Sequence, residues 1–433
     1  MTRPNFVFIL ADDLGYADLG CYGGRANCSP ALDRMAAEGL RFTDGYANSP
    51  VCSPTRFALA TGRWQYRLRG GADEPIASRA RGSEVLGLPP EHPTLASLLR
   101  DAGYATALIG KWHLGFPPKF GPLKSGYTEF FGPLAGGVDY FAHCDSAGKH
   151  DLYEGETEVH REGYLTDLLS ERAVQFVQGR RGEPFLLSLH YTAPHWPWET
   201  RGDATESRRI GNRIAHTDGG SVETYLGMIR HMDEGIARVL EALKSTGADE
   251  NTLVVFTSDN GGERYSDTWP LIGKKMDLLE GGIRVPYVVR WPGRIPACAT
   301  TSQLAITMDW AATFLDAAGV VPHPDYPLDG ASLLRVLEAP SNTFERELFW
   351  RMKFRRQKAM RAGNWKWLSI EGREYLFNLA MDQRERANVA KRETECLAAL
   401  RERYREWEAT LPPIPEDAKV SLVYGPEDLP EPS

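Results

Sequence analysis

The chain has 433 residues, 42% of them hydrophobic, and a formal net charge of -8 at pH 7. A chain of this length buries a large core and is expected to divide into two unequal parts. Its acidic balance argues against a broad basic surface for nucleic acid, because phosphate binding depends on clustered Lys and Arg. We therefore expect no nucleic-acid partner, and any site for an anion must be local.

Short β-branched and aromatic runs alternate with segments of helical periodicity. The run 5–10 predicts a buried strand that ends in the polar loop at Asp12 and Asp13. Ser29, followed by proline, is expected to cap a helix that stops at Gly39, and Thr94 to cap another. Further strands are predicted at 105–109, 185–190, 253–257 and 285–290, with helices near 165–178 and 222–243. This alternation predicts an α/β sheet with helices on both faces.

The pattern changes beyond about residue 340. Short aromatic runs at 348–350, 366–368 and 375–377 predict small antiparallel strands. Apolar residues spaced by three and four predict a last helix with one packed face, namely Leu397, Leu400, Tyr404, Trp407 and Leu411. We expect a large domain over 1–340 and a small α+β subdomain over 341–433, with an irregular tail after Leu411.

The cysteines are too few and too scattered for a disulfide framework, and none forms a close C-x-x-C pair typical of zinc sites. They are Cys21, Cys28, Cys52, Cys144, Cys298 and Cys396. The first apolar run is too short for a signal sequence, and no later run approaches a membrane span. We expect free thiols, a cytoplasmic location and no membrane partner.

Oxygen-donor side chains follow two of the predicted strands. Asp12 and Asp13 follow the first strand, and Asp259 and Asn260 follow the strand at 253–257. Because the carboxyl ends of strands in an open α/β sheet line one crevice, these side chains can converge there. Three carboxylates and an amide suit a hard divalent cation such as Ca²⁺ or Mg²⁺. Asp-Asp and Asp-Asn-Gly-Gly are equally typical of ordinary turns.

A second group of residues surrounds Cys52. Ser53 as N-cap and Pro54 as first helical residue place Cys52 just before a helix, with Arg56 one turn inside it. An anion held there meets free backbone N–H groups and a guanidinium. The alternative is a buried structural cysteine beside a helix start.

The motif Cys52-x-Pro-x-Arg, followed by Thr61-Gly62-Arg63, resembles the formylglycine sulfatase motif, whose cysteine a maturation enzyme converts to an aldehyde. Other family-like segments follow in the expected order: GKWHLG at 110–115, APHWP at 193–197, SDNG at 258–261, Lys275 five residues before EGGIRVP at 280–286, LFNL at 376–379 and the stretch 382–388. Independent motifs reinforce one another. The resemblance implies the alkaline phosphatase superfamily fold, a large mixed, mostly parallel sheet flanked by helices, with 1–340 as the catalytic domain.

The resemblance also implies a role for each matching residue. Calcium, in preference to magnesium, would be held by Asp12, Asp13, Asp259, Asn260 and an oxygen of the formylglycine made from Cys52. Arg56 and Lys111 would stabilise the hydrated aldehyde, and His113 would touch this nucleophile. Lys275 and His195 would contact the sulfate.

The expected reaction is hydrolysis of a sulfate monoester of an aryl group, small molecule or saccharide. Its anionic oxygens repel a nucleophile, so cations must neutralise the charge that builds in the transition state. An aldehyde hydrate offers one hydroxyl to attack sulfur and another to expel sulfate, an exit that a serine ester lacks. A hydrolase of phosphonate monoesters or phosphodiesters, and an inactive metal-binding homologue with unmodified Cys52, are the alternatives.

Several assignments stay open. A one-residue slip would exchange Lys274 with Lys275. The small polar residue that often contacts sulfate has only candidates here, Asp139, Tyr140 and His143, and we place His143, His150 and His160 in surface loops. Aromatic and guanidinium groups that suit a sugar or aryl ring, or else an ordinary rim, are Arg63, Trp64, Tyr66, Arg67, Arg69, Trp196, Trp198, Tyr265 and Trp269.

Overall fold

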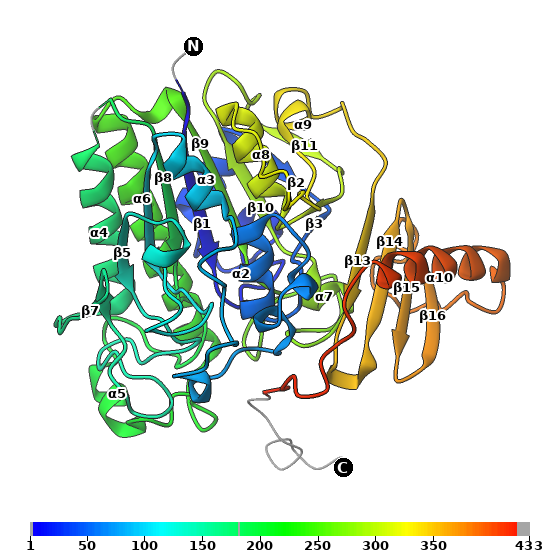
Figure 1. Cartoon of the computed structure of the whole chain (residues 1–433), viewed down its shortest axis with the longest axis horizontal. Coiled ribbons are helices and arrows are strands. Elements are labelled where there is room, and N and C mark those ends of the chain that lie inside the picture. The colour runs from blue at the N-terminus through cyan, green and yellow to red at the C-terminus, as the bar shows by residue number, and fades with distance from the viewer. Residues whose placement is uncertain (1–2, 181, 422–433) are drawn as a thin grey trace.

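The computed structural model describes residues 3–180 and 182–421, and a ten-stranded sheet forms its centre (Figure 1). The strand order is β11-β2-β10-β9-β1-β8-β4-β5-β6-β7. These strands are β1 Asn5–Ala11, β2 Leu40–Phe42, β4 Ala105–Gly110, β5 Glu129–Gly132, β6 Tyr153–Glu154, β7 Thr157–Glu158, β8 Phe185–His190, β9 Thr252–Ser258, β10 Tyr287–Arg290 and β11 Ala299–Thr301. Strands β9, β1, β8, β4 and β5 pair in parallel, as do β11 and β2, whereas β10, β6 and β7 pair antiparallel to their neighbours. The predicted mixed, mostly parallel sheet is confirmed.

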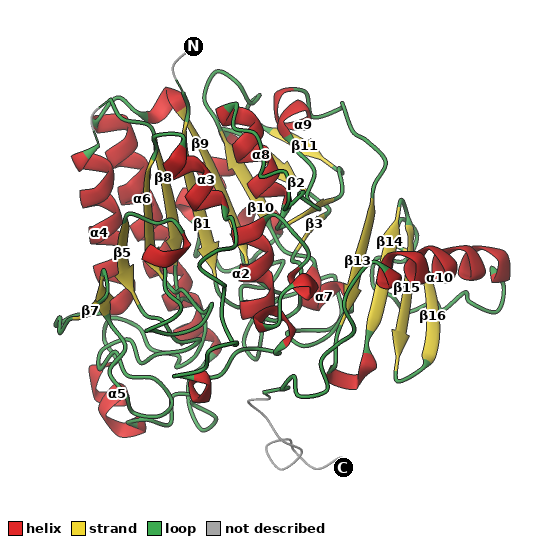
Figure 2. Cartoon of the chain, in the orientation of Figure 1, coloured by secondary structure: helices red, strands yellow, loops and turns green. Residues whose placement is uncertain are grey.

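Helices cover both faces of this sheet (Figure 2). Alternate side chains of a strand point to opposite faces, so Val7 and Ile9 of β1 pack with α1, α4 and α6, while Phe6 and Phe8 pack with α3 and α8. The helices are α1 Pro30–Ala37, α2 Cys52–Thr61, α3 Leu95–Asp101, α4 Leu165–Gly179, α5 Ala204–Ile210, α6 Val222–Ser245, α7 Glu280–Ile283, α8 Asp309–Ala318, α9 Leu334–Glu338 and α10 Thr394–Ala409. Both layers are therefore built from the hydrophobic faces that the sequence pattern predicts.

The predicted helix starts differ in how they are capped. Thr94 forms a capping box with Ser97 ahead of α3, as predicted. Ser29 precedes α1 but does not cap it, because its hydroxyl accepts the Gly20 N–H at 2.9 Å and bonds to Asp33. The helix ends at Ala37, two residues before the predicted stop. The sequence thus predicts where α1 starts, whereas the partner of the Ser29 hydroxyl is supplied by a neighbouring loop.

A second, four-stranded antiparallel sheet lies beside the first, at the right of Figure 1. Its strands are β13 Glu347–Arg351, β14 Lys358–Ala362, β15 Trp365–Ile370 and β16 Arg373–Asn378, and a separate pair joins β3 Gly45–Tyr46 to β12 Ala305–Ile306. Three of these four strands match the aromatic runs, but β14 carries charged residues and no such run. Helix α10 ends before Leu411, which is buried beyond it, so the predicted last turn is wrong.

Buried polar contacts join the small sheet to the large one. The Lys366 ammonium on β15 is fully buried between Glu280 at 2.9 Å and Glu385 at 2.8 Å. Trp350 on β13 donates to the Ala47 carbonyl at 2.8 Å. The small sheet is therefore anchored to the loops that carry the motifs, and the boundary at residue 340 stays a prediction.

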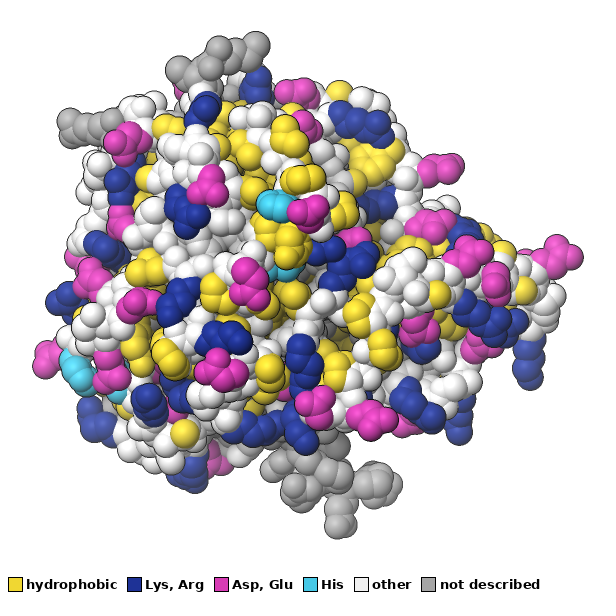
Figure 3. Space-filling model, in the orientation of Figure 1, with side chains coloured by type: hydrophobic (Ala, Val, Ile, Leu, Met, Phe, Trp, Pro, Cys, Tyr) yellow, Lys and Arg dark blue, Asp and Glu magenta, His cyan; other side chains and the backbone are white. Residues whose placement is uncertain are grey.

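The tail after Leu411 is irregular up to residue 421, as predicted, although two backbone bonds of 2.8 Å hold Lys419 and Ser421 to Glu74. The rest of the predicted tail, 422–433, lies outside the described residues. None of the helices within the described ranges is long and apolar enough to cross a membrane. Figure 3 shows Lys and Arg side chains intermingled with Asp and Glu on the visible face, without a broad basic patch there.

Candidate active site

The predicted site residues converge at the carboxyl ends of four adjacent parallel strands. Asp12 follows β1, Asp259 follows β9, Lys111 follows β4 and His190 ends β8. Strands that run parallel finish at the same edge of a sheet, where loops leave a crevice. Residues up to about 250 positions apart in the chain thereby become neighbours.

The oxygen donors form one buried cluster. Ligand atoms of Asp12, Cys52 and Asp259 lie within 4.8 Å of one another, and so do those of Asp12, Asp13 and His195. The Asn260 amide donates to Asp13 at 2.7 Å. Among the described residues, Asp12 Oδ1 and Asn260 Oδ1 are buried without a hydrogen-bond partner, which is uncommon for buried oxygens. These residues fit a divalent cation that prefers oxygen ligands.

Cys52 is the first residue of α2, and the predicted capping of this helix is wrong. Val51 occupies the N-cap position with extended backbone, and the Ser53 hydroxyl instead accepts the Ile76 N–H at 2.9 Å. Pro54 still fits, since the first helical turn needs no N–H from it. Burial raises the pKa of the Cys52 thiol, which stays protonated beside carboxylates. The unmodified thiol is therefore a poor nucleophile.

Three cations neutralise the buried carboxylates. The Arg56 guanidinium, 1% exposed, bonds Asp259 through Nε at 3.0 Å and Nη2 at 2.8 Å. Lys111 Nζ contacts Asp12, and Lys275 Nζ lies 2.8 Å from Asp13. Such charge-assisted bonds fix each side chain in one orientation.

The carboxylates retain unequal proton affinities despite these cations. Burial, followed by the Asp12 carboxylate, raises the pKa of Asp259. Burial also opposes ionisation of Asp12, but Lys111 and other cations outweigh it and lower its pKa. A divalent cation between the two would favour the ionised form of both.

Two histidines present nitrogen lone pairs. His113 Nε2 lies 2.6 Å from the Ile76 carbonyl and must donate to it, which leaves Nδ1 without a partner among the described residues. Burial and Lys111 lower the pKa of His113 well below its usual value, so Nδ1 carries a lone pair. His195 Nδ1 bonds the Trp196 carbonyl at 2.6 Å, and burial with Lys275 lowers its pKa to about 4. Its Nε2, 3.7 Å from an Asp13 oxygen, also carries a lone pair.

A cavity of about 640 Å³ opens above these groups. Its floor includes Cys52, His113, His195 and Lys275. Apolar side chains form much of its wall, including Ile76, Trp196, Ile214, Met276 and Phe354, and charged groups reach its rim at Glu263, Lys274, Asp277 and Arg355. Phe354 and Arg355 lie in the connection between β13 and β14, so both parts of the chain shape this cavity.

A second cavity of the same volume lies against the small sheet. It is lined in part by Arg284, Arg346 and Arg361, and it includes none of the predicted site residues. The cavity that contains Cys52 is therefore the candidate active site.

The two neighbouring lysines differ in position, and three candidate residues lie away from the cavity. Lys275 faces Asp13, whereas the Lys274 side chain is exposed at the rim. Asp139, Tyr140 and His143 do not line the cavity. His143 is 1% exposed, so its predicted surface position is wrong.

Most of the aromatic and guanidinium groups suggested for substrate binding are structural. Trp64 and Tyr66 pack on Trp407 of α10, and Arg67 pairs with Asp329 at 2.8 Å. Trp198 is buried against Tyr265, whereas Trp269 is 59% exposed and stacks against Arg384 outside the cavity. Only Trp196 of that set lines the cavity.

His190 is a site residue that the sequence reasoning missed. It is 6% exposed, and its Nδ1 lies 3.5 Å from Arg56 Nη1, so it packs against the guanidinium that holds Asp259. Its position at the end of a predicted parallel strand could have identified His190 as a site residue from the sequence.

A buried carboxyl pair supports the loop that carries His195. Glu199 accepts the Tyr140 N–H at 3.2 Å, and the Tyr140 hydroxyl donates to the His195 carbonyl at 2.9 Å. Burial and the Asp139 carboxylate raise the pKa of Glu199 to about 9, so it stays protonated and can donate to Asp139. Folding therefore retains a proton on Glu199 that the unfolded chain loses near pH 4.5.

We expect Glu199→Gln to flatten the pH dependence of stability. In the native protein the folded state binds the extra proton, so the free energy of unfolding falls as pH rises from about 4.5 towards 9. The amide oxygen of the Glu199→Gln variant can still accept the Tyr140 N–H, and an amide does not titrate. Urea unfolding at several pH values measures this, with exposed Glu395→Gln as the control; an unchanged slope for Glu199→Gln would contradict it.

Comparisons with known proteins agree with this geometry. The family model described as Sulfatase matches residues 4–320, and one described as N-sulphoglucosamine sulphohydrolase, C-terminal, matches residues 269–407. The chain is 34% identical to N-acetylgalactosamine-6-sulfatase of Canis lupus familiaris over 76% of its own length and 65% of that protein. It therefore spans less than two thirds of this relative.

Solved structures are similar over nearly the whole chain. The crystal structure of Ps i-CgsB superimposes with a TM-score of 0.83 and 32% identity, covering 94% of this chain and 93% of that one. The same protein in complex with k-i-k-neocarrahexaose gives a TM-score of 0.81 and 31% identity, with the same coverage.

Proposed function

Because the chain belongs to the sulfatase family, we propose that it hydrolyses sulfate monoesters with a formylglycine made from Cys52. One observation carries this proposal. Cys52 lies at the floor of the cavity, within 4.8 Å of Asp12 and Asp259, and the cations Arg56 and Lys111 bond to those two carboxylates. An aldehyde hydrate there would be surrounded by the charges that sulfate transfer needs.

An aldehyde hydrate at position 52 supplies one hydroxyl for attack on sulfur and a second whose deprotonation expels sulfate. Asp12, Asp13, Asp259 and Asn260 would hold a divalent ion, which would supply positive charge near the sulfate oxygens. Residues of the chain position the nucleophile, accept its proton and contact the sulfate. Arg56, fixed by Asp259, and Lys111 hold the nucleophile, and the free Nδ1 of His113 accepts a proton. Lys275 and His195 contact the sulfate from the Asp13 side.

The proposed substrate is a sulfated saccharide or an aryl sulfate. Trp196 and Phe354 offer aromatic faces on the cavity wall, which suit a sugar or aryl ring. Ps i-CgsB, which is similar over most of this chain, has been crystallised with k-i-k-neocarrahexaose. The family's maturation enzyme is the partner required to oxidise Cys52.

Parallel assays on a sulfate monoester and a phosphonate monoester with the same aryl leaving group test this function. We expect the sulfate ester to be the better substrate by kcat/KM when the protein is produced with a maturation enzyme. A preference for the phosphonate would replace the proposal with phosphonate hydrolysis. Turnover of neither ester, with Cys52 still unmodified after production beside a maturation enzyme, would indicate the inactive metal-binding homologue.

We propose Ca²⁺ as the bound cation and expect a single ion at the four predicted ligands. Oxygen distances of about 2.3 to 2.6 Å would identify calcium, whereas about 2.0 to 2.1 Å would identify magnesium. Asp259→Ala should abolish binding, because it removes a ligand and frees Arg56. Anomalous scattering from crystals soaked in Ca²⁺ measures this, and an empty site in loaded crystals of the unchanged protein would contradict it.

A further inference from the structure

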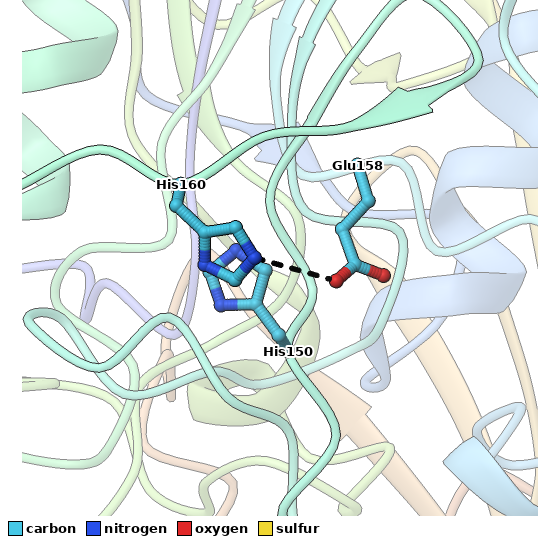
Figure 4. Close-up of side chains that lie close together, drawn as sticks. All are labelled: His150, Glu158 and His160. Carbon is cyan, nitrogen blue, oxygen red and sulfur yellow. Dashed lines mark ion pairs between the residues drawn. The ribbon is translucent and has the colours of Figure 1, made fainter.

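A cluster of metal-binding side chains lies outside the active-site cavity, around the β6–β7 hairpin at one edge of the large sheet. Glu158 ends β7, and His160 follows two residues later on the same face of an extended segment. His150 approaches from the segment before β6. One ring nitrogen of each histidine and one Glu158 oxygen lie within 4.8 Å of one another (Figure 4).

The side chains already share an orientation. The rings of His150 and His160 stack with centroids 4.1 Å apart, and His160 Nε2 lies 3.8 Å from a Glu158 oxygen (Figure 4). His150 Nε2 bonds the Val159 carbonyl at 2.9 Å, which orients this ring and leaves its other nitrogen as a ligand. Histidines that bind metals are commonly held by such a bond to a carbonyl.

Two imidazoles and a carboxylate suit Zn²⁺ better than Ca²⁺, which takes oxygen ligands. Tetrahedral Zn²⁺ with bonds of about 2.0 to 2.1 Å needs ligand atoms about 3.3 Å apart. Glu158 and His160 are exposed, so rotation of their side chains can close the remaining distance. His143 adds a buried imidazole whose ring lies 6.2 Å from that of His150 and whose Nε2 has no partner among the described residues.

We propose that His150, Glu158 and His160 bind a Zn²⁺ ion, which ties the segment before β6 to β7. This ion would be separate from the one in the active site, and the proposal does not depend on sulfatase activity.

A Zn²⁺ ion bound by His150, Glu158 and His160 would also stiffen one wall of the active-site cavity. Asp151 follows His150, and its carboxylate accepts the Ala135 N–H at 2.7 Å. The next residue, Gly136, lines the cavity. Arg81 bonds both Asp145 and Asp151 and thereby braces the segment before β6.

Zinc titration of the full chain tests the site, with a His150→Ala/His160→Ala double variant and a His323→Ala control. His323 is a partly exposed histidine on a loop far along the chain. We expect the unchanged protein and the control to bind one more equivalent of Zn²⁺ than the double variant does. Zinc-edge anomalous diffraction should place that ion between the three side chains. Equal stoichiometry in all proteins, or no peak at this position, would overturn the proposal.

Amide hydrogen exchange tests separately whether bound Zn²⁺ stiffens the cavity wall. Zn²⁺ should slow exchange over residues 133–161 in the unchanged protein and in His323→Ala, but not in the double variant. Glu158→Gln, which keeps both rings, should weaken binding and reduce this protection. Zinc that binds without slowing exchange would overturn the link to the cavity wall.

Discussion

Cys52→Ala should abolish sulfate-ester turnover, with a loss on the order of 10⁴-fold or more, because it removes the only proposed covalent nucleophile. The side chain is buried at the floor of the cavity, so substitution by alanine should leave the fold intact. The buried thiol has a raised pKa and cannot substitute for the hydrate. Activity should therefore follow the fraction of Cys52 that is converted to the aldehyde.

Peptide mass spectrometry measures that fraction, and assays on preparations made with and without a maturation enzyme measure the activity. Cys28→Ala is a matched control, since Cys28 is also buried but belongs to the hydrophobic core, bonds the Asp18 carbonyl and does not line the cavity. It should retain turnover. A preparation that is fully active with every Cys52 unmodified would exclude the proposed mechanism.

His113→Ala and His195→Ala should fail in different ways, each with a loss of about 10² to 10⁴ in rate. His113 Nδ1 carries a lone pair and has no partner within residues 3–180 and 182–421, as a base that helps to expel sulfate requires. Its loss should permit one rapid release of the alcohol or phenol, followed by very slow turnover. His195 Nε2 faces Asp13, and a bound sulfate anion there favours the protonated ring. The His195→Ala substitution should lower the rate most with substrates that have poor, alcohol-like leaving groups.

Rapid-mixing assays with aryl and alkyl sulfates separate these outcomes, and melting curves of both variants control for stability. If both histidines serve only packing, their losses should be equal, independent of the leaving group, and proportional to the loss of stability. Identical profiles for the two variants would remove the proposed division of labour.

Local patterns along the chain predicted the framework well. The apolar run before Asp12 is β1, and the run before Asp259 is β9, because strand ends are marked by an abrupt change from buried to polar residues. Thr94 also caps its helix as predicted. Strand β14 was missed because Lys358 and Arg361 leave no apolar run, and their acidic partners, Glu408 and Asp44, lie outside the small sheet.

Contacts between distant segments were not predictable in the same way. Ser53 looked like a helix cap, but its hydroxyl bonds Ile76, and the helix starts one residue earlier than Ser53. Trp64 looked like a substrate platform, but it packs under α10. His143 looked like a surface residue, but it is buried. Each error concerns a partner supplied by another part of the fold.

The sequence by itself determined the family motifs, the strand and helix order, and the identity of the buried charges at the strand ends. Only the tertiary structure decided which atoms of those charges meet: Arg56 with Asp259, Lys275 with Asp13, and His113 with the Ile76 carbonyl. The reason is physical, because periodicity and capping act over a few residues, whereas these pairs are set by strand register and by the packing of loops across the sheet.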